Sequence, residues 1–183
     1  MSMKRSLVWL AAVCATLAVV GGCNPGPGSS PPEVTAAPGG LSGAVVSVAD
    51  GDTFTMMTSV GEKIKVRLLG VDAPEVAHGG DTADCGADAA HDALEELLSE
   101  GTSVDVVFDL RADRYDRYGR ALGYVSTDVV DDVALRLLDA GLVEAWIPAG
   151  EPQPERFAEY REAQSRAQDA GVGAWVGCDT LGR

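Results

Sequence analysis

The stretch SGAVVSVADGDTFTMMTSVGEKIKVRLLGV, residues 42–71, decides the fold class. It contains three short segments rich in Val, Thr and Ile, at 42–49, 53–58 and 63–71, and the glycines Gly51 and Gly61 punctuate the joins. Short β-type segments joined by glycine turns are typical of an antiparallel meander. We therefore predict three consecutive strands in this part of the chain.

The remainder of the chain adds two strands and three helices to this meander. The strands are expected at 103–110 and 121–126, and the helices at 81–100, 131–140 and 154–170, where apolar residues recur at helical spacing. Three strands, a helix, two strands and a further helix is the order of an oligonucleotide-binding (OB) barrel. The predicted fold is therefore α+β, a five-stranded antiparallel OB barrel with about three helices.

Composition and charge limit the classes of protein to which the chain can belong. The 183 residues include 14 Lys+Arg and 28 Asp+Glu, which gives a net charge of −14, and 46% of the residues are hydrophobic. Beyond the N-terminus no apolar run approaches the roughly 18 residues of a membrane span, which excludes a polytopic membrane protein. The acidity argues against a protein that binds nucleic acid through bulk positive charge.

The N-terminal residues 1–22 have the pattern of a lipoprotein signal peptide. Lys4 and Arg5 precede the apolar run 7–20, and VGGC at 20–23 resembles a bacterial lipobox. On this interpretation Cys23 is the first mature residue and carries lipid, which would hold the protein on the outer face of the cell membrane. The alternative is a plain signal peptide with a cysteine at the cleavage zone.

Residues 23–40 are predicted to be a tether that begins at the lipid-anchored cysteine. The part from 24 to 40 contains five Pro and four Gly in 17 residues and offers almost nothing to bury. The folded domain is therefore expected to span 41–183.

Two cysteines, Cys85 and Cys178, remain in the predicted domain after Cys14 leaves with the signal peptide. In an exported protein they either form a disulfide or stay as free thiols. A disulfide across so long a loop would contribute on the order of 4 kcal/mol in the chain-entropy model. Together with His78 and His91 they make a poor zinc site, because the spacing does not match familiar ligand sets.

Three polar motifs punctuate the predicted barrel: DGDT at 50–53, RLLGVDAPE at 67–75 and DRYGR at 116–120. Each has a local explanation as a turn or strand end. If the three converge, however, two arginines from separate strands face several carboxylates. Carboxylate oxygens suit a hard cation and guanidinium groups suit phosphate, a combination that favours phosphodiester cleavage.

With these motifs in this order, and GVGAW at 171–175, the chain resembles the staphylococcal nuclease (thermonuclease) family over roughly residues 41–175. The resemblance implies a Ca²⁺ ion bound by Asp52, Asp72 and the backbone carbonyl of Ala73. It also implies that Glu75 is the general base, and that two arginines clamp the phosphate and stabilise the transition state. These arginines are Arg67 and Arg120. Asp50 would be a further carboxylate near the metal, and the products would carry 3′-phosphate ends.

The sequence leaves alternatives open for the residues around this predicted site. Asp50 and Asp116 either serve the site or only cap turns, and Arg114 and Arg117 are either part of a phosphate track or solvated loop charges. Tyr118 either packs against the barrel or stacks on a base. Trp146 is either a base-stacking residue or a plain core residue.

Two functions from different classes follow from these observations. The first is a calcium-dependent endonuclease that cuts DNA, RNA or both outside the cytoplasm, with nucleic acid as its partner and the membrane contacted through the N-terminal lipid only. The second is a catalytically inactive OB-barrel binding module for nucleic acid or another surface ligand. A monomer is expected in either case.

Overall fold

The computed structural model describes residues 39–77, 79 and 82–181. The predicted signal peptide, the lipidation at Cys23 and nearly all of the predicted tether lie outside the described residues, as does His78. No helix among the described residues is long and apolar enough to cross a membrane.

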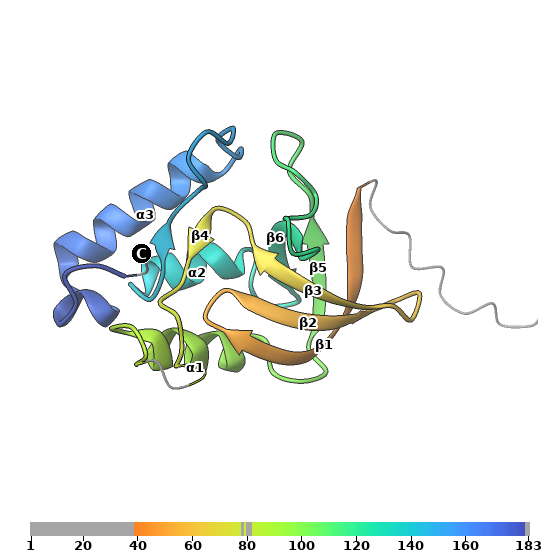
Figure 1. Ribbon diagram of the computed structural model, residues 1–183, viewed down its shortest axis with the longest axis horizontal. Helices are drawn as coiled ribbons and strands as arrows, with labels where there is room; N and C mark the ends of the chain where they lie inside the picture. Colours follow the sequence, from red (N-terminus) through yellow and green to blue (C-terminus); the bar gives the residue numbers. More distant parts are fainter. Residues whose placement is uncertain (1–38, 78, 80–81, 182–183) are drawn as a thin grey trace, which may run out of the picture. The chain divides into compact units, whose positions relative to one another are not determined.

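A closed five-stranded barrel forms the centre of the fold, as predicted (Figure 1). Its strands are β1 (Gly40–Asp50), β2 (Thr53–Thr58), β3 (Lys63–Leu68), β5 (Ser103–Val107) and β6 (Ala121–Thr127), in the order β1-β2-β3-β6-β5. The meander of β1, β2 and β3 is the one that was predicted from residues 42–71. Four of the five strand pairs that close the barrel are antiparallel, whereas β3 and β6 pair in parallel.

The predicted strand 63–71 is interrupted, and this break shapes the site described below. β3 ends at Leu68, and a two-residue strand β4 (Val71–Asp72) leaves the barrel to pair with β7 (Glu144–Ala145). Gly70 makes the turn between β3 and β4 with φ of +82°, a conformation that other residues rarely adopt. The prediction of one continuous strand was therefore wrong at its C-terminal end.

Three α-helices surround the barrel, in the predicted order. They are α1 (Ala87–Leu97), α2 (Val133–Asp139) and α3 (Phe157–Ala170), and a short 3₁₀ helix η1 (Gly173–Val176) follows. α1 and α3 begin later than the predicted 81 and 154. Asp132 caps α2, since its Oδ1 accepts a hydrogen bond of 3.0 Å from Leu135 N.

The core fills the barrel and the space under the helices. Its largest side chains that exclude solvent almost completely are Tyr160, Phe54, Met56, Leu68, Leu94, Leu98, Leu137, Leu138 and Leu181. α1 packs on β1, and α2 packs on both α3 and β6. The helices therefore share one core with the barrel.

A set of polar side chains, here called the α3 clamp, fastens the start of α3 to the barrel and to α2. It consists of Asp109, Tyr124, Asp132, Arg156 and Tyr160. Asp132 Oδ2 accepts from Tyr160 Oη and pairs with Arg156 Nη1, both at 2.6 Å. Asp109 Oδ2 accepts from Tyr124 Oη and from the backbone N–H of Glu155.

A disulfide joins Cys85, just before α1, to Cys178, just after η1, with 5.8 Å between the two Cα atoms. This confirms the predicted pairing over the alternative of free thiols. The bridge ties the segment after α3 to the start of α1.

Candidate active site

Three charged residues from separate elements meet in a buried group at the barrel mouth, here called the mouth cluster. Asp52 comes from the turn between β1 and β2, Arg67 from β3 and Asp72 from β4. Arg67 Nη1 lies 2.7 Å from Asp52 Oδ2, and Arg67 Nη2 donates to Asp72 Oδ1. The three residues are only 2%, 8% and 2% exposed. A single guanidinium therefore bridges the two carboxylates that the sequence assigned to the metal.

Close packing around the turn explains why Asp52 takes this position. A Cβ atom at Gly51 would lie 2.7 Å from the Cβ of Ala90 on α1 and 2.8 Å from the Cβ of Ala73. Only glycine lets the turn approach this closely. The N–H of Ala73 then donates to Asp52 Oδ2 at 3.1 Å, which fixes the carboxylate from its other side.

Burial and like charge set the electrostatics of the mouth cluster. Burial raises the pKa of Asp52 to about 7, the charge of Arg67 opposes the rise, and the charge of Asp50 adds to it. Burial alone would lower the pKa of Arg67, but the charges of Asp52 and Asp72 raise it above its ordinary value. The cluster therefore holds the charge of Arg67 firmly, whereas burial disfavours the charge of Asp52.

The second predicted arginine, Arg120, is oriented by Asp116 in the same turn. Asp116 Oδ2 accepts from Arg120 Nε at 2.7 Å, and its Oδ1 accepts from the backbone N–H groups of Tyr118 and Arg120, both at 2.9 Å. These hydrogen bonds outweigh burial and lower the pKa of Asp116. Asp116 thus caps the turn and at the same time fixes the guanidinium.

Thr53 connects Arg120 to the mouth cluster. Its hydroxyl donates to Asp52 Oδ1 at 2.8 Å and accepts from Arg120 Nη1 at 3.3 Å. This role was not predicted from the sequence, because the β-propensity of threonine already explains its presence at the start of a strand.

The two arginines share a pocket with Glu75, the predicted general base. The pocket has a volume of about 340 Å³ and is lined by Lys65, Arg67, Glu75, Tyr118 and Arg120. Glu75 is exposed and follows β4 by three residues. Residues of two of the three motifs thus line one cavity, and the third motif contacts it through the hydrogen bonds of Asp52 to Arg67 and of Thr53 to Arg120.

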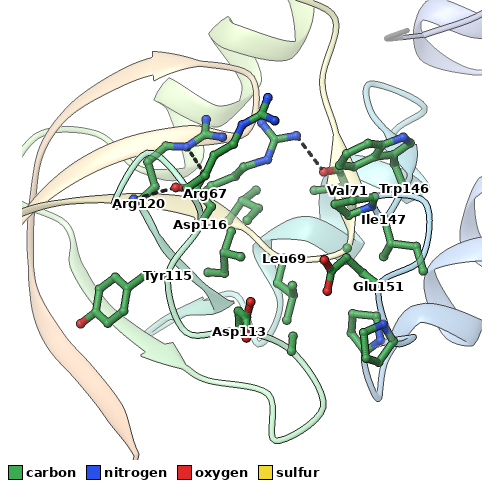
Figure 2. A pocket seen from close by; sticks show the side chains of 18 of the residues that line it. Arg67, Leu69, Val71, Asp113, Tyr115, Asp116, Arg120, Trp146, Ile147 and Glu151 are labelled. Carbon is green, nitrogen blue, oxygen red and sulfur yellow. Dashed lines mark hydrogen bonds and ion pairs between the residues drawn. The ribbon is translucent and has the colours of Figure 1, made fainter.

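A second, larger pocket of about 550 Å³ adjoins the first, and Arg67, Tyr118 and Arg120 line both. Figure 2 shows Arg67 and Arg120 on one side of it and Trp146 and Ile147 on the other, with Leu69 between them. Trp146 is half-buried in this wall, so its alternative as a plain core residue was wrong. Its indole face is available to a flat ligand.

The remaining substrate candidates lie on the loop before β6. Tyr118 is 68% exposed, so the alternative that it packs against the barrel was wrong. Its ring lies under two guanidinium groups, with Arg117 Cζ 4.7 Å and Arg120 Cζ 5.4 Å from the ring centroid. Arg114 instead stacks over Phe108 at 5.3 Å.

Asp50 lies beside Asp52 in the β1–β2 turn. Its Oδ1 accepts from the backbone N–H of Asp52 at 3.1 Å, and its charge raises the pKa of Asp52. Asp50 therefore does both: it caps the turn, and its charge acts on the carboxyl group of Asp52.

The mouth cluster fits a divalent cation by the chemistry of its donors. Asp52 and Asp72 are buried, offer only oxygen ligands and already share one cation, the guanidinium of Arg67. Two carboxylates fixed to share one positive group suit a hard ion such as Ca²⁺. Three residues of α1, the half-buried His91 and the exposed Asp92 and Glu95, also bring ligand atoms within 4.8 Å of one another, but exposed acidic groups are common without a metal ion.

Comparison with known proteins agrees with this geometry. The family model described as "Staphylococcal nuclease homologue" matches residues 65–177, which is more than half of the chain. The chain belongs to the staphylococcal nuclease family. The match includes most of the residues just described and the barrel strands β5 and β6.

Three relatives of this nuclease family illustrate the range of proteins that carry the domain. The chain is 30% identical to Endonuclease YhcR of Bacillus subtilis over 82% of its own length and 13% of that protein. It is 30% identical to Probable endonuclease lcl3 of Pyrenophora tritici-repentis, over 74% of its own length and 58% of that protein. An uncharacterised protein of Methanocaldococcus jannaschii, MJ1439, is 33% identical over 73% of the chain and 70% of that protein.

Proposed function

We propose that the chain is a calcium-dependent endonuclease that hydrolyses phosphodiester bonds in DNA or RNA and leaves 3′-phosphate ends. The observation that carries this proposal is the convergence of Arg67, Arg120 and Glu75 on one pocket beside two buried carboxylates. Two relatives that are named as endonucleases, one of them a probable endonuclease, support it.

Each residue of the pocket has a part in the proposed reaction. Glu75 takes a proton from a water molecule that attacks phosphorus, and the bond from phosphorus to the 5′ oxygen breaks. Arg67 and Arg120 offset the charge that develops on the phosphate oxygens. Ca²⁺, held by Asp52, Asp72 and the carbonyl of Ala73, would supply Lewis-acid stabilisation of that charge.

The larger pocket offers a place for a nucleotide next to the reacting phosphate. Trp146 presents a flat apolar wall, and Tyr118 and Arg117 lie exposed at its edge. Stacking of a base on Trp146 or Tyr118, with Arg117 on a phosphate, would hold an unpaired strand across the site.

We also propose that the protein acts outside the cytoplasm as a lipid-anchored monomer. The pattern of residues 1–22, with Cys23 as the lipidated residue, supports this location. The disulfide between Cys85 and Cys178 supports it as well, because disulfides persist in oxidising compartments.

Cleavage of a single-stranded DNA oligonucleotide by residues 24–183 in millimolar calcium tests the proposed activity. We expect cutting in calcium, none in chelator, and a loss of at least about 100-fold in kcat for Glu75→Gln. Glu62→Gln is the matched control, since Glu62 is exposed in the β2–β3 turn and lines neither pocket. A folded protein that binds the oligonucleotide and does not cut it would instead identify a binding module.

A further inference from the structure

The backbone of Glu75 is held on both sides by a single residue, Asp84. The N–H of Asp84 donates to the carbonyl oxygen of Glu75 at 3.0 Å, and Asp84 Oδ2 accepts from the N–H of Glu75 at 3.2 Å. The two hydrogen bonds fix the position of the Glu75 main chain relative to Asp84.

Asp84 is in turn the neighbour of Cys85, whose disulfide partner lies after α3. Cys178 belongs to the segment Gly173–Leu181, here called the C-terminal strap, which packs against the start of α1. A Cβ atom at Gly86 would lie 2.7 Å from the Cβ of Ala174 in this strap. Figure 1 shows the strap, in dark blue, beside α1.

The C-terminal strap is itself anchored to the rest of the fold. Leu181 is fully buried, and its N–H donates to Glu144 Oε1 at 2.7 Å next to the β4–β7 pair. Cys178 therefore lies between two fixed points, η1 and Leu181. Through the disulfide it offers Cys85 a covalent attachment to a well-held part of the molecule.

The site residues differ in how they are supported. Asp52, Arg67, Asp72 and Arg120 lie in or next to strands, and their side chains are joined by hydrogen bonds in which Thr53 takes part. Glu75 is exposed, lies between β4 and α1, and has the two main-chain hydrogen bonds to Asp84.

We propose that the Cys85–Cys178 disulfide is a positioning element of the active site, which acts through Asp84 to place Glu75 in its pocket. This inference rests on the proposed function, in which Glu75 is the general base. A base displaced by about 1 Å slows proton transfer without weakening substrate binding. Loss of the disulfide should therefore lower kcat about 10-fold, with KM and the calcium Kd within twofold of the wild-type values.

A double-mutant cycle separates positioning from a general contribution to stability. It compares the wild type, Cys85→Ser/Cys178→Ser, Asp84→Ala and the triple variant, with cleavage of a DNA oligonucleotide in calcium well below every measured Tm. If the disulfide acts through Asp84, the triple variant should be no slower than the slower of the two parents. Asp179→Ala is the matched control, because Asp179 is an exposed acid next to Cys178 and should leave kcat unchanged.

Chemical reduction gives a second test, in which the reduced wild type is compared with the variant that lacks the disulfide. Dithiothreitol should lower the kcat of the wild type to that of the Cys85→Ser/Cys178→Ser variant and should not change the kcat of that variant. If the Cys85→Ser/Cys178→Ser variant does not fold, Asp84→Ala in the oxidised protein is the deciding variant. Its kcat must fall about 10-fold with KM unchanged.

The outcomes distinguish this inference from the proposed function. If the oxidised wild type does not cut DNA or RNA, the proposed function fails. If it cuts and neither reduction nor Asp84→Ala lowers kcat, the positioning role is wrong and the disulfide only stabilises the fold. A multiplicative loss in the triple variant would also overturn the proposal, because the disulfide and Asp84 would then act separately.

Discussion

The mouth cluster and the α3 clamp are both buried networks of acids and arginines. The pKa of one acid in each network is shifted, and the two shifts have opposite directions. In the α3 clamp, Asp109 accepts hydrogen bonds from Tyr124 and from the backbone N–H groups of Arg111 and Glu155. Although burial opposes them, these donors lower the pKa of Asp109. In the mouth cluster, burial raises the pKa of Asp52 even though it has Arg67 as a partner.

The difference lies in what surrounds each acid. The donors around Asp109 outweigh its burial, whereas the burial of Asp52 outweighs its own donors, and a second carboxylate, Asp50, lies beside it. A network that only stabilises the fold satisfies its acids. The mouth cluster instead keeps two carboxylates around one cation, an arrangement whose oxygen ligands would suit a divalent metal ion.

The largest effect is expected when the α3 clamp is broken by Asp132→Ala. This change removes the cap of α2, the acceptor of Tyr160 Oη and the partner of Arg156 together. Leaving the buried hydroxyl of Tyr160 unpaired costs about 1–3 kcal/mol and loss of the helix cap costs about 1 kcal/mol, so the free energy of unfolding should fall by about 2 kcal/mol or more in urea titrations. Asp131→Ala at the exposed neighbouring position is the control, and a loss below 1 kcal/mol for Asp132→Ala would show that the clamp is dispensable.

A smaller effect of opposite sign is expected in the mouth cluster for Asp52→Asn. Because the pKa of Asp52 is raised in the folded protein, the folded state binds this proton more tightly than the unfolded state does. The wild type therefore loses stability as the pH rises from about 4 to about 7, and the D52N variant should not. One pKa unit corresponds to about 1.4 kcal/mol, so the variant should be more stable than the wild type by at least about that amount at pH 8.

Urea titrations of both proteins at pH 5 and pH 8, without calcium, check this expectation, and calorimetry should show that D52N no longer binds calcium. A variant that is less stable than the wild type at pH 8 would mean that the ion pair with Arg67 outweighs burial. The contrast between the two networks would then fail.

The smallest effect is expected for Thr53→Val, which cuts the link between Arg120 and the mouth cluster without changing the shape of the side chain. Arg120 Nη1 loses an acceptor, so kcat should fall about fivefold, equivalent to about 1 kcal/mol. Thr53→Ser keeps the hydroxyl and should recover most of the rate. Thr55→Val is the matched control, because Thr55 is also buried in β2 and its hydroxyl bonds to no described residue. Equal losses of kcat for both valine variants would show that the hydroxyl of Thr53 has no special role.

Local patterns were sufficient to predict the barrel, because alternation and glycine turns mark each strand of the meander. They failed where a long-range contact decides the outcome. The segment 63–71 is rich in β-forming residues throughout, and the sequence does not reveal that Gly70 turns and that Val71 pairs with Ala145 instead. Nor does alternation within a strand specify the direction of its neighbour, so the parallel pairing of β3 and β6 was not foreseen.

The site was predictable to a similar degree. The motifs identified the residues that gather at the mouth, since each motif ends or begins a strand. They did not reveal that Arg67 lies between Asp52 and Asp72, because this depends on the turn at Gly70. The exposure of Tyr118 was left open, since an aromatic residue in a turn gives no sign of which side it faces.

The parallel pairing of β3 with β6 also has a consequence for the order in which the molecule folds. Asp52, Arg67, Asp72 and Glu75 all come from residues 50–75, within or next to the β1-β2-β3 meander, whose contacts are short in sequence. Arg120 reaches them only when β6 pairs with β3, which closes a loop from Leu68 to Ala121 and costs more chain entropy. Asp52 and Arg67 thus belong to local structure, Asp72 is placed by the pairing of β4 with β7, and Arg120 joins them at the step that closes the barrel.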